Sequence, residues 1–88
     1  MKLTEERAKA IVYDDDFEYE TVARIEDSDV FKCYRGVTTV VKDKKNNYFG
    51  IDWQEYVNHY GDGEDYFFDC ELRPIAYVEV TKKEWIYQ

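Results

Sequence analysis

Residues 17–26 read FEYETVARIE, and this stretch decides the fold class. Alternate positions carry side chains that suit one buried face: Phe17, Tyr19, Thr21, Ala23 and Ile25. Most positions between them are charged. An alternation of period two is typical of a strand with one face buried and the other exposed to water. We therefore expect a half-buried strand over residues 17–26.

Further strands are expected on the C-terminal side of this stretch, over residues 30–42, 48–53 and 75–82. Gly36 suggests a bulge or bend in the first of these, and Phe49, Ile51 and Trp53 share one face of the second. Polar turns at residues 27–29 and 43–47 separate the first three. The chain holds nine valines and two leucines, which favours strands over helices. Hairpin-length connections between consecutive strands predict an antiparallel sheet.

One short helix is expected before the sheet, over residues 3–12. Thr4 is a suitable N-cap, and Glu5 and Glu6 follow in the first turn, where the helix dipole favours negative charge. The apolar stripe of this helix is thin, so the helix must pack on the sheet. The fold class is therefore α+β: residues 1–88 form a single small domain, with one N-terminal helix packed on an antiparallel sheet of about four strands.

Residues 54–87 show no single secondary-structure pattern. Residues 54–60 fit a helical turn, and residues 61–65 a loop. The apolar run of residues 66–68 must be anchored, because three adjacent exposed rings would promote aggregation. Trp85 and Tyr87 fit either a last edge strand that closes the core or a recognition tail; we expect the edge strand.

The composition limits the classes of function. The chain has 88 residues, of which 36% are charged and 18% aromatic, with a net charge of −8. The aromatic content indicates a folded chain, and the net charge argues against direct binding to nucleic acid. The sequence has no apolar run long enough to span a membrane and no signal-peptide pattern, so we expect a cytoplasmic protein without a membrane partner.

The negative charge is concentrated in two blocks, residues 14–29 and residues 51–71, each with a net charge of −7. Both blocks contain aromatic residues. Carboxylates with interleaved rings form a surface that a basic protein partner can bind. The candidate partner-binding residues are Asp14, Asp15, Asp16, Glu18, Glu20, Tyr60, Asp62, Glu64, Asp65, Tyr66 and Asp69.

Two other interpretations of the acidic blocks stay open. The charge can serve solubility alone. The chain can also be an assembly module that forms a homodimer or larger oligomer through an exposed strand edge or through residues 66–68. In that case, binding would not weaken with salt.

No catalytic, metal or cofactor site is expected. Asp14–Asp16 and the later acidic block lack the spacing of a calcium loop. Cys33, Cys70 and His59 are too few and too scattered for a zinc site, and their spacing suggests no catalytic dyad. The carboxylates beside Gly61 and Gly63 would repel a phosphate.

Residues 73–85, RPIAYVEVTKKEW, resemble the C-terminal ending of short acidic proteins from phages and prophages of Gram-positive bacteria. Small acidic phage proteins often bind a host protein, as anti-restriction proteins, anti-CRISPR proteins and uracil-DNA glycosylase inhibitors do. The resemblance implies an inhibitor or DNA mimic that occupies a nucleic-acid-handling site on a basic host protein.

Overall fold

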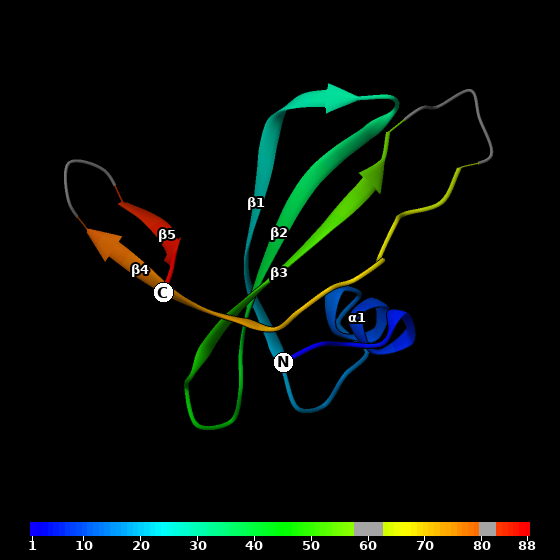
Figure 1. Cartoon of the computed structure of the whole chain (residues 1–88). Helices are drawn as coiled ribbons and strands as arrows, with labels where there is room; N and C mark the ends of the chain where they lie inside the picture. The colour runs from blue at the N-terminus through cyan, green and yellow to red at the C-terminus, as the bar shows by residue number, and fades with distance from the viewer. Residues whose placement is uncertain (58–62, 80–82) are drawn as a thin grey trace.

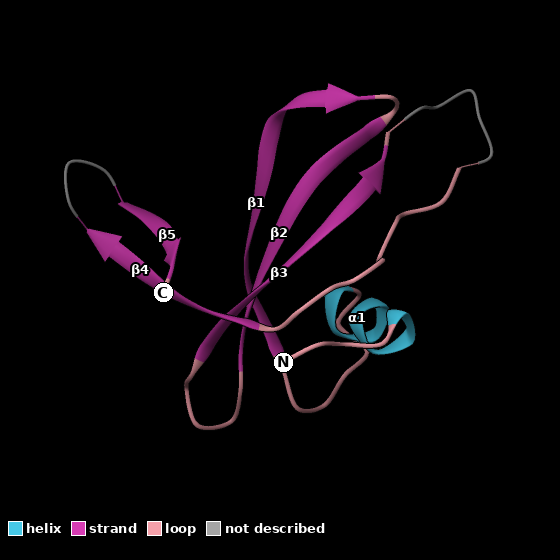
Figure 2. Ribbon diagram, in the orientation of Figure 1, coloured by secondary structure: helices cyan, strands magenta, loops and turns pink. Residues whose placement is uncertain are grey.

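The computed structural model describes residues 1–57, 63–79 and 83–88 (Figure 1). One helix and five strands follow in the order α1 (Glu5–Val12), β1 (Glu20–Phe31), β2 (Tyr34–Lys42), β3 (Tyr48–Tyr56), β4 (Arg73–Glu79) and β5 (Lys83–Tyr87) (Figure 2). The strands form one antiparallel, curled sheet in sequential order. The predicted helix and antiparallel sheet are confirmed, but the sheet has five strands rather than four.

The additional strand is β5, which carries Trp85 and Tyr87. Its pairing with β4 places these residues on the edge strand that the sequence favoured over a recognition tail. The predicted strand 75–82 corresponds to β4, which already begins at Arg73; residues 80–82 lie outside the described part of the chain.

Strand β1 differs most from the prediction. It begins at Glu20, so Phe17 lies before it and is 94% exposed. The turn predicted over residues 27–29 is wrong, because β1 continues through it with a shift of register between Glu26 and Val30. The chain reverses instead at Lys32 and Cys33, which both adopt positive φ angles. A period-two pattern cannot show a bulge in advance, because the extra residue looks like a break in the strand.

A second irregularity changes the face that β1 buries. Thr21 pairs with Val41 and Ala23 with Val40, so Val22 is the extra residue of a bulge. Since neighbouring residues of β2 point to opposite faces of the sheet, Thr21 and Ala23 also lie on opposite faces. The predicted single face of residues 17–26 is therefore wrong.

The β2–β3 hairpin agrees with the sequence in its turn and in its buried face. The carboxylate of Asp43 accepts hydrogen bonds from the backbone N–H groups of Lys45 and Asn47, each at 2.9 Å. Pairing continues without interruption from Lys42 with Tyr48 to Tyr34 with Tyr56. Gly36, where a bulge or bend was expected, lies opposite the shift of register in β1, whereas its pairing with β3 is regular. Residues 54–56 continue β3 instead of forming a helical turn, and residues 58–60 lie outside the described residues.

The main core fills the face of the sheet that α1 covers. The Thr4 side chain caps α1 by accepting a hydrogen bond from the Arg7 N–H at 3.1 Å. Ala8 and Ile11 of α1 are buried in one apolar cluster with side chains of β2, β3 and the segment before β4: Val37, Val41, Ile51, Trp53, Phe67, Cys70 and Leu72. This cluster gives the thin apolar stripe of α1 the partner it needs.

The opposite face is partly covered by the β4–β5 hairpin, which Figure 1 shows on the other side of β1–β3 from α1. Strand β4 pairs with β3 only through Pro74 and Arg73, and then turns away. Val40 and Ile75 are buried outside the main cluster. The ring of Tyr87 lies over Gly50 so closely that a Cβ on Gly50 would stand 2.6 Å from the hydroxyl oxygen. A side chain at position 50 would therefore force the Tyr87 ring to move where the hairpin crosses β3.

In the described part of the chain, no helix is long and apolar enough to cross a membrane.

Candidate protein-binding surface

Tyr66, Phe67 and Phe68 point alternately out of and into the protein. Phe67 is buried and its ring stacks on Trp53, with centroids 5.0 Å apart. Tyr66 and Phe68 are 50% and 65% exposed, and their ring centroids lie 6.0 Å apart. The expected anchoring of this run is confirmed for the central ring only. The two outer rings form an exposed aromatic pair.

Backbone pairing fixes this aromatic pair against the edge of β3. Tyr66 and Gln54 exchange two N–H···O=C hydrogen bonds, at 2.8 and 3.0 Å. The buried Phe67 then holds the next residue in place. Because the rings stand on paired backbone, they are pre-organised for contact with a partner.

Carboxylates lie on both sides of the aromatic pair. On one side, Tyr66 and Phe68 line a cavity of about 420 Å³ together with Asp27 and Asp52. On the other side, they line a second cavity of about 420 Å³ with residues of α1 and of the segment before Tyr66: Glu5, Lys9, Glu64 and Asp65. We call Tyr66, Phe68, Glu5, Asp27, Asp52 and Glu64 the acidic aromatic surface.

Three of the four carboxylates have no ion-pair partner among the described residues: Glu5, Asp27 and Glu64. Asp52 is engaged, because it accepts hydrogen bonds from the Thr38 and Tyr87 hydroxyls and lies 3.7 Å from the guanidinium of Arg73. The acidic aromatic surface therefore keeps carboxylates that can pair with cations from another molecule.

Asp65 has a structural role instead. One of its oxygens accepts the backbone N–H of Tyr56 at 2.9 Å, and the other accepts the hydroxyl of Tyr13. These contacts connect the end of α1 to the end of β3. Burial and the negative charge of Asp65 raise the pKa of Tyr13 to about 12. Asp65 therefore helps to fix the position of α1 relative to β3.

This raised pKa predicts a loss of stability at alkaline pH. An unfolded tyrosine ionises near pH ~10, so between that pH and about pH 12 the folded state holds a proton that the unfolded state has lost. The stabilising contribution of Tyr13 is thus complete below about pH 10 and disappears as the pH rises through about 12. Thermal unfolding across this range should show a shallower alkaline decline for Tyr13→Phe than for the wild type. Equal declines would contradict the assignment.

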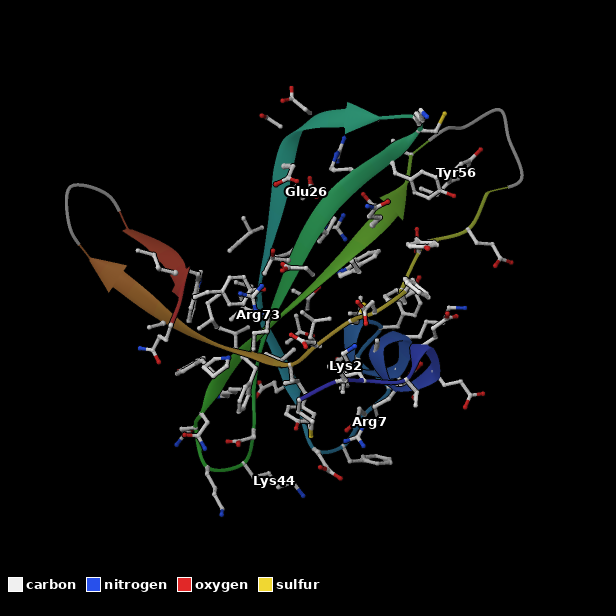
Figure 3. All side chains as sticks on the ribbon, viewed as in Figure 1. Lys2, Arg7, Glu26, Lys44, Tyr56 and Arg73 are labelled. Carbon is white, nitrogen blue, oxygen red and sulfur yellow. The ribbon has the colours of Figure 1, made fainter. Side chains whose placement is uncertain are left out.

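Part of the first acidic block is paired with cations of the same chain. Arg7 of α1, labelled in Figure 3, pairs with Asp16 at 2.7 Å and with Glu18 at 3.4 Å. Glu20 lies 3.6 Å from the ammonium group of Lys42. Asp16, Glu18 and Glu20, which were named as candidate partner-binding residues, thus each lie beside a cation of the same chain. Sequence periodicity could not show these ion pairs, because Arg7 is distant in sequence from Asp16 and Glu18, and Lys42 is distant from Glu20.

The remaining candidates have different positions. Asp14 and Asp15 follow α1 and are exposed, and Asp14 adopts a φ of 63°. Asp69 pairs with Lys2 at 3.0 Å, where the N-terminal residues run antiparallel to the segment before β4. Tyr60 and Asp62 lie outside the described residues. Among the described residues, the two acidic blocks meet at the ion pair between Arg24 and Glu55, at 2.6 Å.

Four members of the acidic aromatic surface were missed as site residues: Phe68, Glu5, Asp27 and Asp52. The alternation of residues 66–68 in an extended segment could have indicated that Phe68 is exposed with Tyr66. No signal of this kind exists for Glu5, Asp27 and Asp52, because only the packing of α1, β1 and β3 brings them to this place.

Cys70 is a structural residue. Its side chain is buried in the main core, and its thiol donates to the carbonyl oxygen of Asp52 at 3.2 Å. Burial and nearby carboxylates raise the pKa of this thiol to about 11, which keeps it in the unreactive protonated form. Within the described residues, His, Cys, Asp and Glu form no group that could hold a metal ion.

Comparison with known proteins adds no relative: no family model, no curated protein and no solved structure matches this chain. The resemblance of residues 73–85 to endings of phage proteins therefore stays a prediction. The geometry of the acidic aromatic surface is therefore the basis for inferring a function.

Proposed function

We propose that this chain is a non-catalytic protein-binding module that uses the acidic aromatic surface to occupy a basic site on another protein. The observation that carries the proposal is the exposed pair Tyr66 and Phe68 with carboxylates on both sides. The partner is a protein with an arginine- or lysine-rich site of the kind that handles nucleic acid.

The chemistry of the surface suits arginine in particular. A guanidinium can stack on an aromatic face and form a bidentate pair with a carboxylate at the same time. Tyr66 and Phe68 supply two faces within one contact area, and Glu64 and Asp27 lie on opposite sides of them. Aromatic residues at the centre of an interface, surrounded by charges, commonly contribute most of the binding energy.

A salt-controlled capture experiment with matched variants tests this proposal. The tagged chain is incubated with lysate of the source cell at low and high salt, and retained proteins are identified by mass spectrometry. We expect a basic protein that is retained at low salt and released at high salt, because salt screens exposed charge pairs. Phe68→Ala and Glu64→Gln should each reduce its retention.

The control is Phe17→Ala, which removes a ring that is even more exposed but lies outside this surface. This variant should retain the partner as well as the wild type does. If Phe17→Ala and Phe68→Ala reduce capture equally, general stickiness of exposed rings explains the binding. If neither does, the acidic aromatic surface is not the binding site.

A second candidate function is homo-oligomeric assembly, and one observation favours it. β1 stands at the edge of the sheet, and among the described residues no strand pairs with its outer side. It also exposes Val22, Ile25 and Val30. Bulges near both ends of β1 oppose regular pairing with a second copy. Light scattering at low and high salt tests this function, since an oligomer held by strand pairing would persist in both.

A further inference from the structure

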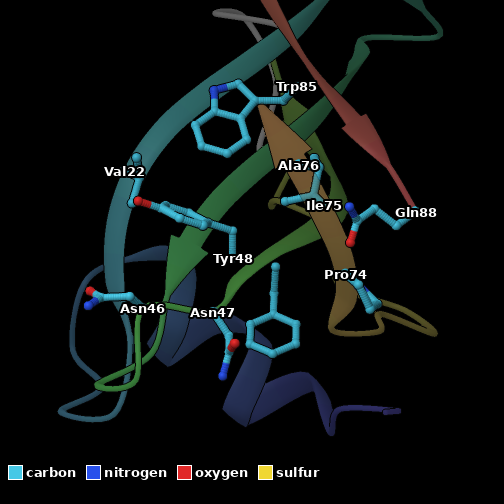
Figure 4. A pocket seen from close by; sticks show the side chains of 10 residues that line it. Val22, Asn46, Asn47, Tyr48, Pro74, Ile75, Ala76, Trp85 and Gln88 are labelled. Carbon is cyan, nitrogen blue, oxygen red and sulfur yellow. The ribbon is translucent and has the colours of Figure 1, made fainter. Parts of the chain in front are cut away.

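One cavity lies away from the acidic aromatic surface, on the face of the sheet that the β4–β5 hairpin covers. Its volume is about 740 Å³. Val22 of β1 and Tyr48 of β3 form one side of it, and Ala76 of β4 and Gln88 form the other, with Trp85 of β5 at one end (Figure 4). The two edge strands of the sheet thus face each other across an open space.

Among the described residues that line this cavity, none has a charged side chain, although 36% of the chain is charged. Apolar and aromatic side chains dominate it: Val22, Tyr48, Phe49, Pro74, Ile75, Ala76 and Trp85. The polar groups of these side chains are the Tyr48 hydroxyl, the Trp85 indole N–H and the amides of Asn46, Asn47 and Gln88. An ionised ligand would lose hydration here without gaining a counter-ion from these side chains, so they select against charge.

The shape of the cavity favours a compact ligand. Its volume lies within the range of small-molecule sites, about 300–1,000 Å³. The rings of Tyr48 and Trp85 already contact each other, with centroids 5.2 Å apart, so they form a continuous aromatic wall. Asn46 and Asn47 precede β3, and Gln88 follows β5. Their side-chain amides can therefore bind a carbonyl or hydroxyl group of a ligand from two segments.

We propose that this cavity is a binding site for a small uncharged molecule with an apolar, ring-containing body and one or two hydrogen-bonding groups. The site shares no residue with the acidic aromatic surface. Ligand binding here is thus a function separate from protein binding there, and each can fail without the other.

Two fluorescent probes that differ by one charge test the proposal on the full chain. N-phenyl-naphthylamine is neutral, whereas anilinonaphthalene sulfonate has the same rings with a sulfonate. We expect saturable fluorescence enhancement with the neutral probe at one site per chain. The sulfonated probe should bind at least roughly tenfold more weakly, because its charge must be desolvated.

Variants locate the site. Ala76→Trp fills the cavity from β4, and Val22→Trp fills it from the bulge of β1, where the side chain is partly exposed. Circular dichroism checks that each variant is folded. Either folded variant should abolish binding of the neutral probe, and Phe68→Ala should leave it unchanged.

Three results would overturn the proposal: no saturable binding of the neutral probe, equal affinity for both probes, or binding that is lost in Phe68→Ala but kept in the filled variants. A cavity that binds only an extended peptide would give the first of these results.

Discussion

Trp53→Ala is expected to unfold most of the protein at room temperature. Trp53 is 5% exposed and stands at the centre of the main core. Replacing a buried tryptophan by alanine typically costs about 3–5 kcal/mol, and small domains have little stability to lose. Circular dichroism during urea titration should then show an unfolding transition of much smaller amplitude than that of the wild type.

The contacts of Trp53 explain why no neighbour compensates. Its ring stacks on Phe67, and Arg24 lies over it at 5.6 Å. Its indole N–H donates to the buried hydroxyl of Thr39 at 2.9 Å. Trp53→Phe is the matched control, because it keeps an aromatic ring in the core while it removes this hydrogen bond and part of the ring volume. We expect it to lose about 1–2 kcal/mol. A Trp53→Ala protein with near-normal stability would contradict the described core.

Gly50→Ala has the second large expected effect. Gly50 does not have a positive φ, so alanine fits its backbone. The added Cβ would nevertheless stand 2.6–2.8 Å from three atoms of the Tyr87 ring. Either the ring or the hairpin must move, and the hydrogen bond from Tyr87 to Asp52 would break. Overpacking of this kind costs about 1–3 kcal/mol, which urea unfolding can measure.

A double-mutant cycle separates this steric effect from others. In a Tyr87→Ala background, the clash is gone and Gly50→Ala should become neutral or stabilising by about 0.4–1 kcal/mol, because alanine restricts the unfolded chain. The sign of the effect is therefore expected to reverse. An equal cost in both backgrounds would mean that β4 and β5 do not cover β3 as described.

The sequence predicted the elements in which local pattern and packing agree. Phe49, Ile51 and Trp53 were expected on one face of a strand, and the structure packs all three against the main core. Thr4 was expected to cap the helix, and it does. In both cases the deciding interactions lie within a few residues of each other, so period and capping rules apply directly.

The prediction was wrong where long-range pairing decides the structure. The bulges of β1 depend on its register with β2, and the fifth strand depends on a hairpin that crosses Gly50. The charge blocks made Asp16 and Glu18 candidate partner-binding residues but could not show that Arg7 pairs with both. Ion pairs between distant segments are a property of the folded chain, and no local pattern encodes them.

The most direct test of the acidic aromatic surface is a calorimetric titration of the captured partner with wild type, Phe68→Ala and Phe17→Ala at two salt concentrations. We expect Phe68→Ala to weaken binding by roughly tenfold or more, as loss of a central aromatic contact does. Phe17→Ala should leave the affinity unchanged, and added salt should weaken binding of the wild type. Unchanged affinity of Phe68→Ala, together with binding that does not depend on salt, would contradict the account.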